Sequence, residues 1–157
     1  LISHNTFSYN NLTPYENLKF YGKLHGLSNL DTRIEELLNE VDLFQRRRDP
    51  VRTFSRGMQQ RLAIARAMLN KPSIIFLDEP YTGLDQHATK ILTGILKKLH
   101  TAQNTIIMTT HNLKQGLEVS DQVIIMAFGK IVFQKPVPEI ISEEFEQIYF
   151  GCVEKRK

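Results

Sequence analysis

The sequence of 157 residues contains a single cysteine and no long hydrophobic run. The one cysteine, Cys152, excludes an intrachain disulfide and fits a reducing compartment. The longest apolar runs, such as residues 123–128, are far shorter than the roughly 18 residues that a membrane-spanning helix requires. Any connection to a membrane is therefore expected to go through a partner.

The net charge is also small, and at +3 it gives no argument for a nucleic-acid partner, which calls for a clustered basic stripe. A hydrophobic fraction of 41% and a charged fraction of 24% are typical of a soluble globular domain. The length suits a single domain with its own core. The chain opens at Leu1-Ile2 without a Met or a signal-peptide pattern, which predicts the tail of a strand whose beginning is missing. We therefore expect a fragment.

The most informative stretch is residues 73–80, Ser-Ile-Ile-Phe-Leu-Asp-Glu-Pro. Apolar residues without polar alternation predict a strand buried on both faces, in the centre of a parallel sheet. Because the proline ends the strand, Asp78 and Glu79 lie at its carboxyl end, where open α/β sheets bind ligands. The pair suits Mg²⁺ and an attacking water, with Asp78 as metal ligand and Glu79 as general base. Taken alone, the segment is equally well an acidic turn that emerges into solvent.

The spacing of the other residues predicts alternating helices and strands. Thr13 as N-cap, with Pro14 and Glu16 after it, predicts a helix to about Leu24, and Asp31 is expected to cap a second one. Strand, helix and strand over residues 73–109 form a right-handed βαβ unit. Further helices are expected at residues 56–70, at residues 85–100 and from Pro138 onward, and further strands at residues 105–109, 123–126 and 131–133.

Two more features are compatible with phosphate chemistry. Ser55-Arg56-Gly57 begins a long helix, where free N–H groups and the helix dipole make an anion site. An ordinary serine N-cap is the simpler alternative. His111 follows the strand at residues 105–109, where it could bind a γ-phosphate or the attacking water. A lone histidine at a strand end is more often a surface or turn residue.

These features follow the order of the motifs of ABC-type ATPases. Residues 54–61, Phe-Ser-Arg-Gly-Met-Gln-Gln-Arg, resemble the signature motif, and residues 74–80 resemble the Walker B strand with its catalytic glutamate. Residues 83–85 resemble the D-loop, residues 109–111 the switch histidine, and residues 2–18 the Q-loop and the entry to the helical subdomain. The resemblance implies an α/β fold: a partial P-loop NTPase (RecA-like) parallel sheet with an inserted α-helical subdomain. It divides one domain, residues 1–157, into a helical subdomain at 13–70, a core at 71–135 and a C-terminal part at 136–157.

The resemblance also implies roles at an ATP and Mg²⁺ site. Asp78 would hold Mg²⁺ through water, Glu79 would polarise the attacking water, and His111 would sense the γ-phosphate. Such ATPases close head-to-tail as two-fold dimers, so the signature motif serves the ATP bound by the opposite subunit. There the γ-phosphate would meet Ser55, Gly57 and the neighbouring backbone at Arg56 and Met58, with Asp85 at the dimer seam.

The departures from the family pattern are informative. His4 stands where the family has the Q-loop glutamine, Arg56 where the signature often has its first glycine, and Met58 where it often has glutamine. A P-loop requires Gly, four residues and Gly-Lys-Ser/Thr, and neither Gly22-Lys23 nor Gly129-Lys130 fits that pattern. We therefore expect that this chain alone neither binds nor hydrolyses ATP measurably.

The expected function is that of an ATP-hydrolysing subunit that energises export through a transmembrane permease, cytoplasmic and peripheral on the inner face of the membrane. His4, residues 15–21 and the signature are most similar to the haem exporters of cytochrome c biogenesis, although ABC-2-type exporters share most of these features. A non-catalytic module that donates only its signature face is the alternative. A soluble ABC ATPase of translation or DNA repair is less expected, because a second cassette and a coiled-coil insertion are both missing.

Overall fold

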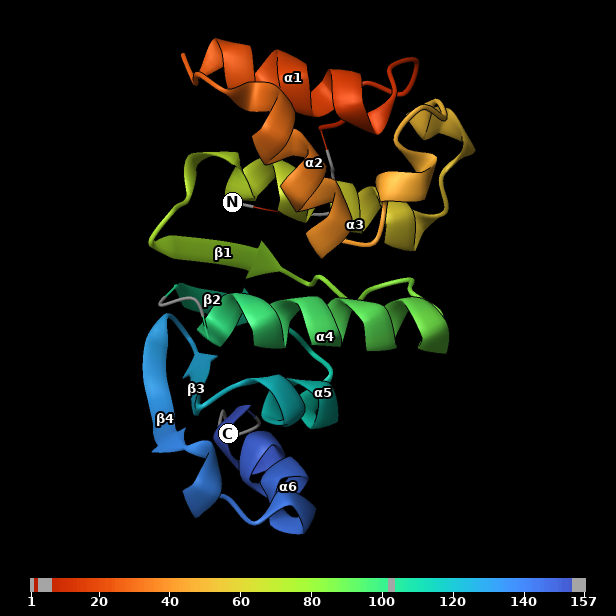
Figure 1. Cartoon of the computed structure of the whole chain (residues 1–157). Helices are drawn as coiled ribbons and strands as arrows, with labels where there is room; N and C mark the ends of the chain where they lie inside the picture. The colour runs from red at the N-terminus through yellow and green to blue at the C-terminus, as the bar shows by residue number, and fades with distance from the viewer. Residues whose placement is uncertain (1, 3–6, 102–103, 154–157) are drawn as a thin grey trace. The chain divides into compact units, whose positions relative to one another are not determined.

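The structure is a computed structural model that describes residues 2, 7–101 and 104–153. It consists of two compact units, Leu1–Thr109 and Thr110–Lys157, and each is described by itself (Figure 1). Within the described ranges, none of the helices is long and apolar enough to cross a bilayer. The two units do not test the predicted division at residues 70 and 135, which stays a prediction.

The first unit contains a small parallel sheet. β1 (Ile74–Asp78) pairs in parallel with β2 (Thr105–Thr109), and α4 (Gln86–Thr101) connects them. Ile2 forms a parallel bridge to Leu77 on the other side of β1: its N–H donates to Phe76 O at 2.9 Å, and its carbonyl accepts from Asp78 N at 2.8 Å. β1 is therefore central, as its sequence predicts, and Ile2 lies beside it in a strand-like pairing.

The prediction that β1 is buried on both faces is wrong. Ile75 and Leu77 belong to the core, whereas Ile74 is 51% exposed and Phe76 is 46% exposed. On β2, Ile107 is 47% exposed as well. The described part of the first unit thus covers the sheet on one face only. A run of apolar residues shows which side chains avoid water, but not how many faces are covered.

A group of helices packs over the covered face of the sheet (Figure 1). Thr13 caps the first helix through the predicted capping box, since Glu16 N donates to Thr13 Oγ1 at 3.2 Å and Thr13 N donates to Glu16 Oε2 at 2.8 Å. The long signature helix begins at Arg56 and continues to Asn70 with a tighter last turn, close to the predicted end. The elements in chain order are α1 (Pro14–Leu24), α2 (Leu30–Glu40), η1 (Phe44–Arg46), η2 (Val51–Thr53), α3 (Arg56–Ala67) and η3 (Met68–Asn70).

Asp31 does not cap α2, contrary to the prediction. The N-cap is Asn29, in the left-handed region at φ 53° and without a side-chain cap. Asp31 lies in the first turn, where its Oδ1 accepts from Tyr15 Oη at 2.6 Å and from Lys19 Nζ at 3.0 Å. The Tyr15 hydroxyl and then the Lys19 ammonium hold the pKa of the Asp31 carboxyl below its ordinary value. Asp31 therefore links α1 to α2 instead of capping its own helix.

The second unit contains α5 (Leu113–Val119), an antiparallel hairpin and α6 (Ser142–Val153). The hairpin joins β3 (Gln122–Ala127) to β4 (Lys130–Pro136), as predicted but with longer strands. The last helix begins later than expected, because Pro138 lies in the short turn η4 (Val137–Glu139) and Ile140 is extended. The helix α5 was not predicted from the sequence; Asn112 caps it, since its Oδ1 accepts from Gln115 N at 3.1 Å.

Candidate active site

The carboxyl ends of β1 and β2 meet at one edge of the sheet and bring Asp78 opposite Thr109. Thr109 Oγ1 donates to Asp78 Oδ1 at 2.6 Å, and the backbone N–H of Glu79 donates to Thr109 O at 3.0 Å. The hydroxyl fixes the orientation of the half-buried Asp78 carboxylate. Carboxylate oxygens are the ligands that Mg²⁺ prefers, and Mg²⁺ commonly takes only one or two from the protein together with substrate phosphates. Asp78 is therefore the candidate Mg²⁺ ligand at this edge.

Glu79 has an unusual backbone conformation. Its φ of 49° lies in the left-handed region, which costs a residue other than glycine about 1–2 kcal/mol. A tight turn holds it there: Thr82 N donates to Glu79 O at 3.2 Å, with Pro80 at the second position of the turn. Thr82 Oγ1 also donates to Glu79 Oε2 at 3.2 Å. Backbone strain of this kind clusters at functional sites.

The signature segment begins α3 as predicted. Ser55 is the N-cap, and its Oγ accepts from Met58 N at 3.3 Å. Gly57 is buried, and a Cβ at this position would lie 2.7 Å from Cβ of Ala88 in α4. The structure thus gives Gly57 a packing role between two helices, in addition to the phosphate approach predicted for it. Whether the free N–H groups of this first turn bind phosphate stays a prediction.

The D-loop segment lies against the signature segment. Gly83 has a φ of +75°, and a Cβ there would lie 3.0 Å from Nε of Arg56, so the arginine side chain passes directly over this glycine. Asp85 caps α4, since its Oδ1 accepts from Ala88 N at 2.7 Å. Arg56 and Asp85 therefore belong to one continuous surface, built from the beginnings of α3 and α4. Its use at a dimer seam is not tested by these contacts.

The two histidines named from the sequence are not joined to this edge by any described geometry. His4 lies outside the described residues. His111 belongs to the second unit, in the bend between β2 and α5, and its role stays a prediction. In the ranges that the structure describes, no three His, Cys, Asp or Glu side chains cluster as a metal site.

Two residues of the site, Thr109 and Thr82, were not among the site residues predicted from the sequence. Both had a signal in the sequence. Thr109 is the last residue of a predicted strand parallel to β1, so it had to lie opposite a residue at the end of β1. Thr82 is three residues after Glu79 with a proline between them, the spacing of a turn whose last side chain can return to the first.

Comparison with known proteins shows the family of the chain. Residues 1–82 match the family model described as "ABC transporter". The ABC transporter ATP-binding protein NatA of Bacillus subtilis is 32% identical over 146 residues, which cover 92% of this chain and 59% of that protein. The Nod factor export ATP-binding protein I of Cupriavidus metallidurans is 34% identical over 150 residues, 92% of this chain and 48% of its own length. The phosphate import ATP-binding protein PstB of Ehrlichia ruminantium is 37% identical over 136 residues, 82% of this chain and 53% of its own length.

The chain spans about half the length of the curated relatives it matches. One of these relatives is named as an export protein and another as an import protein. Similarity at this level therefore fixes neither the cargo nor the direction of transport, and a haem exporter is not among the three relatives compared.

Proposed function

Since the chain belongs to the ABC transporter family of ATP-binding proteins, we propose that it is part of a subunit that hydrolyses ATP to energise transport. The observation that carries the proposal is the edge formed by Asp78, Glu79 and Thr109, where two carboxylates follow a central strand and a hydroxyl orients one of them. Phosphoryl transfer depends mainly on positioning and on electrostatic stabilisation. An edge with fixed carboxylates supplies the protein's share of both.

In this proposal each residue has a separate task. Asp78 holds Mg²⁺ through water, and the hydroxyl of Thr109 keeps its carboxylate in place. Bound Mg²⁺ supplies charge neutralisation of the phosphates. Glu79 accepts the proton of the attacking water, and its strained turn keeps the carboxylate at a fixed position. His111 contacts the γ-phosphate and His4 takes the Q-loop position. Ser55, with the first turn of α3, serves the nucleotide of a second subunit in a head-to-tail dimer.

The partner in transport is proposed to be a transmembrane permease, which places the protein on the cytoplasmic face of the membrane. An exposed aromatic patch supports this proposal. The patch consists of Phe7, Tyr9 and Phe20, which are 63%, 50% and 43% exposed, and Tyr21 lies beside them. The Tyr9 and Phe20 rings meet edge-on at 5.1 Å. Exposed apolar clusters mark interaction sites, and aromatic residues are enriched in protein interfaces.

The aromatic patch has a rigid support. Asn17 is only 2% exposed, and its side chain accepts from Tyr9 N at 2.8 Å and donates to Tyr9 O at 3.1 Å. Tyr21 Oη donates to Phe7 O at 2.6 Å. These bonds attach the segment before α1 to the helix itself, so the patch is already formed before a partner arrives. A pocket of about 440 Å³ beside it, lined in part by Phe7 and Tyr21, gives a docking segment room to insert.

The proposal is tested on the intact protein, co-expressed with its membrane partner. We expect ATP hydrolysis that requires Mg²⁺ and co-purification with a multi-span membrane subunit. Phe20→Glu is expected to abolish co-purification, whereas Phe150→Glu, at a residue 47% exposed in α6, is the matched control and leaves it unchanged. Absence of both hydrolysis and a membrane partner would contradict the proposal.

Haem export for cytochrome c maturation is the finer hypothesis, and it rests on the resemblance of His4, residues 15–21 and the signature segment alone. Identification of the co-purified membrane subunit tests it directly. A non-catalytic module that donates only its signature face is the alternative function. It predicts that the gene carries a start codon immediately before Leu1, whereas an ATPase requires an upstream, in-frame Gly-x4-Gly-Lys-Ser/Thr.

A further inference from the structure

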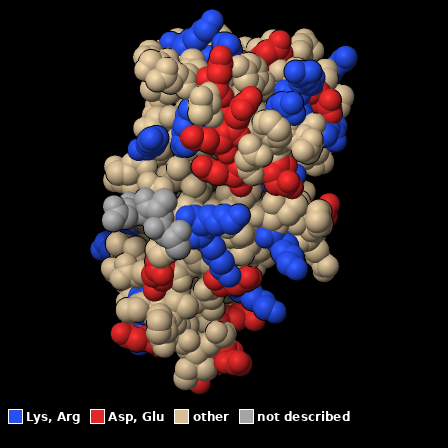
Figure 2. All heavy atoms as spheres, in the orientation of Figure 1, with Lys and Arg blue, Asp and Glu red and all other residues tan. Residues whose placement is uncertain are grey.

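Residues 46–52, Arg-Arg-Arg-Asp-Pro-Val-Arg, hold the excess positive charge of the chain, and we call them the arginine segment. Four arginines and one aspartate give the segment a net charge of +3, which equals the net charge of all 157 residues. The rest of the chain is therefore neutral in sum. Figure 2 shows basic side chains gathered over η1 and η2, the two short helices that this segment joins.

Two guanidinium groups of the arginine segment are available to a ligand. Arg48 and Arg52 are exposed, and among the described residues their side chains make no hydrogen bond or ion pair. Arg47 instead folds back on the protein: its guanidinium donates to Phe44 O at 3.0 Å and lies over the Phe44 ring, 4.1 Å from the ring centre. Arg48 and Arg52 are therefore the arginines of the segment that an anion can pair with at no cost to an existing contact.

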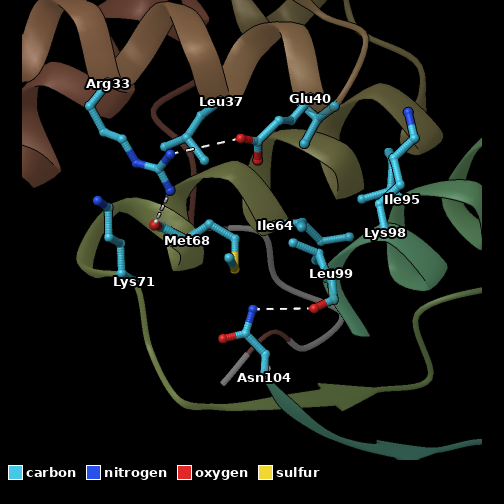
Figure 3. A pocket seen from close by; sticks show the side chains of 11 residues that line it. Arg33, Leu37, Glu40, Ile64, Met68, Lys71, Ile95, Lys98, Leu99 and Asn104 are labelled. Atoms are coloured by element: carbon cyan, nitrogen blue, oxygen red, sulfur yellow. Dashed lines mark hydrogen bonds and ion pairs between the residues drawn. The ribbon is translucent and has the colours of Figure 1, made fainter. Parts of the chain in front are cut away.

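Several other cations of the first unit already face a carboxylate. At the pocket between α2 and α4, the Arg33 guanidinium lies 3.8 Å from Glu40 Oε1 and also donates to Met68 O at 3.1 Å (Figure 3). The same holds for three further ion pairs: Lys19 with Asp31, Arg46 with Asp49, and Arg61 with Asp42. An incoming anion would have to compete with a carboxylate at each of these places, but not at the two exposed arginines of the segment.

The backbone of the arginine segment is fixed before a ligand arrives. Val51 is buried and its N–H donates to Leu12 O at 2.9 Å, while the N–H of Arg52 donates to Asn10 O at 2.9 Å. These bonds join the segment to the residues before α1, where Tyr9 of the aromatic patch directly precedes Asn10. The segment and the aromatic patch are therefore neighbours on the surface of the first unit. Basic residues attracted to anionic headgroups and tyrosines at headgroup level are features of membrane interfaces.

We propose that the arginine segment binds the phosphate groups of anionic phospholipids at a membrane surface. A guanidinium presents its N–H groups in a fork that fits a phosphate with two hydrogen bonds. Neither the pocket of Figure 3 nor the pocket beside the aromatic patch is lined by this segment, so it offers an exposed surface and not a cavity. An array of headgroups reaches several exposed arginines at once, which a small anion does not. The proposal depends neither on ATP hydrolysis nor on a permease.

The test is cosedimentation of the 157-residue chain with vesicles of phosphatidylglycerol and phosphatidylcholine in equal parts. Vesicles of phosphatidylcholine alone are the uncharged reference. We expect binding to the charged vesicles to be at least tenfold stronger than to the reference at about 0.1 M salt. The difference should disappear at about 1 M salt, where the Debye length falls from about 10 Å to about 3 Å.

The test variant is the double substitution Arg48→Glu with Arg52→Glu. Its matched control is Lys71→Glu with Lys90→Glu, which changes the net charge by the same amount at exposed positions outside the arginine segment. A third variant, Arg48→Lys with Arg52→Lys, keeps the charge. Because the four positions are exposed, we expect all three variants to give the circular dichroism spectrum of the parent.

The expected changes separate the arginine segment from net charge. Each basic residue near an anionic surface strengthens binding about fivefold, so the double arginine reversal should weaken binding to the charged vesicles about 25-fold or more. The double lysine reversal and the Arg→Lys variant should each stay within about threefold of the parent. The proposal fails if the charged vesicles bind no better than the reference, or if the two charge reversals weaken binding alike. Displacement of the chain by soluble glycerol phosphate overturns it in favour of a site for a free phosphate, and stronger binding to poly-glutamate than to the charged vesicles overturns it in favour of an acidic protein segment.

Discussion

Replacement of Gly57 by alanine tests the close packing that joins the signature helix to α4. The added methyl group would lie 2.7 Å from Cβ of Ala88, where ordinary contacts between carbon atoms are about 3.5–4.0 Å. One of the two helices therefore has to move by about 1 Å. Gly57 is buried and Ala88 is half-buried, so the strain cannot be relieved by turning a side chain into solvent.

The magnitude follows from two opposing effects. Overpacking a well-packed core costs about 1–3 kcal/mol. Alanine gains up to about 1 kcal/mol over glycine in a helix interior, and less near a helix start, where Gly57 lies. The net loss is about 1–2 kcal/mol. For a chain of this length each kcal/mol lowers the melting temperature by about 2–4 °C.

The assay is urea and thermal unfolding of the 157-residue chain, followed by circular dichroism. Gly94→Ala is the matched control, because a Cβ at this α4 position meets nothing within 4 Å, and it is expected to stabilise by about 0.5–1 kcal/mol. Ala88→Gly in the Gly57→Ala background removes the methyl group that the new Cβ at position 57 would meet. The double-mutant cycle is therefore expected to give a coupling energy of about 1 kcal/mol or more. If Gly57→Ala were as stable as the parent, or if the coupling were zero, the packing argument would be refuted.

Three further predictions concern ATP, the edge of the sheet and pH. The 157-residue chain alone is expected to show no ATP binding in calorimetric titration, and tight binding would contradict the need for a P-loop. In the intact protein, Thr109→Val is expected to lower ATP turnover about tenfold at limiting Mg²⁺, because the Asp78 carboxylate loses its bond to the hydroxyl. Thr109→Ser keeps the hydroxyl and is expected to stay within about twofold of the parent. Equal rates for the two variants would contradict a role for Thr109 in the site. The N–H and then the hydroxyl of Thr13 hold the pKa of the Glu16 carboxyl below its ordinary value. The ionised carboxylate of the capping box therefore adds to the free energy of unfolding above about pH 4.3, and this contribution is lost as the pH falls through the lowered pKa. Unfolding curves at several pH values check this, and Glu16→Ala should flatten the pH dependence.

Much of the candidate site could be predicted because short-range rules govern it. A run of apolar residues ending in two acids and a proline placed Asp78 and Glu79 at the edge of a central parallel strand. Local side-chain chemistry also placed Thr13, Ser55 and Asp85 at the starts of their helices. At each of these positions the cause lies within a few residues of the effect.

The rest depends on contacts between distant residues, which local patterns do not contain. Asp31 looks like an N-cap, but it bonds Tyr15 and Lys19 of the previous helix. The packing of Arg56 over Gly83 joins residues 27 positions apart in sequence. The exposure of Ile74 shows that a hydrophobic strand does not reveal how many of its faces are covered.

The most direct test of the account is the ATPase rate of the intact protein with Glu79 replaced by glutamine. The amide keeps the size of the side chain but cannot accept the proton of the attacking water. We expect ATP binding within about twofold of the parent and a loss of turnover of roughly 10²–10⁴-fold, the usual contribution of a general base. Glu139→Gln, at an exposed position in η4, is expected to change neither quantity. Near-normal hydrolysis by the Glu79→Gln variant would contradict the central claim, since the carboxylate at the end of β1 would then not be the base.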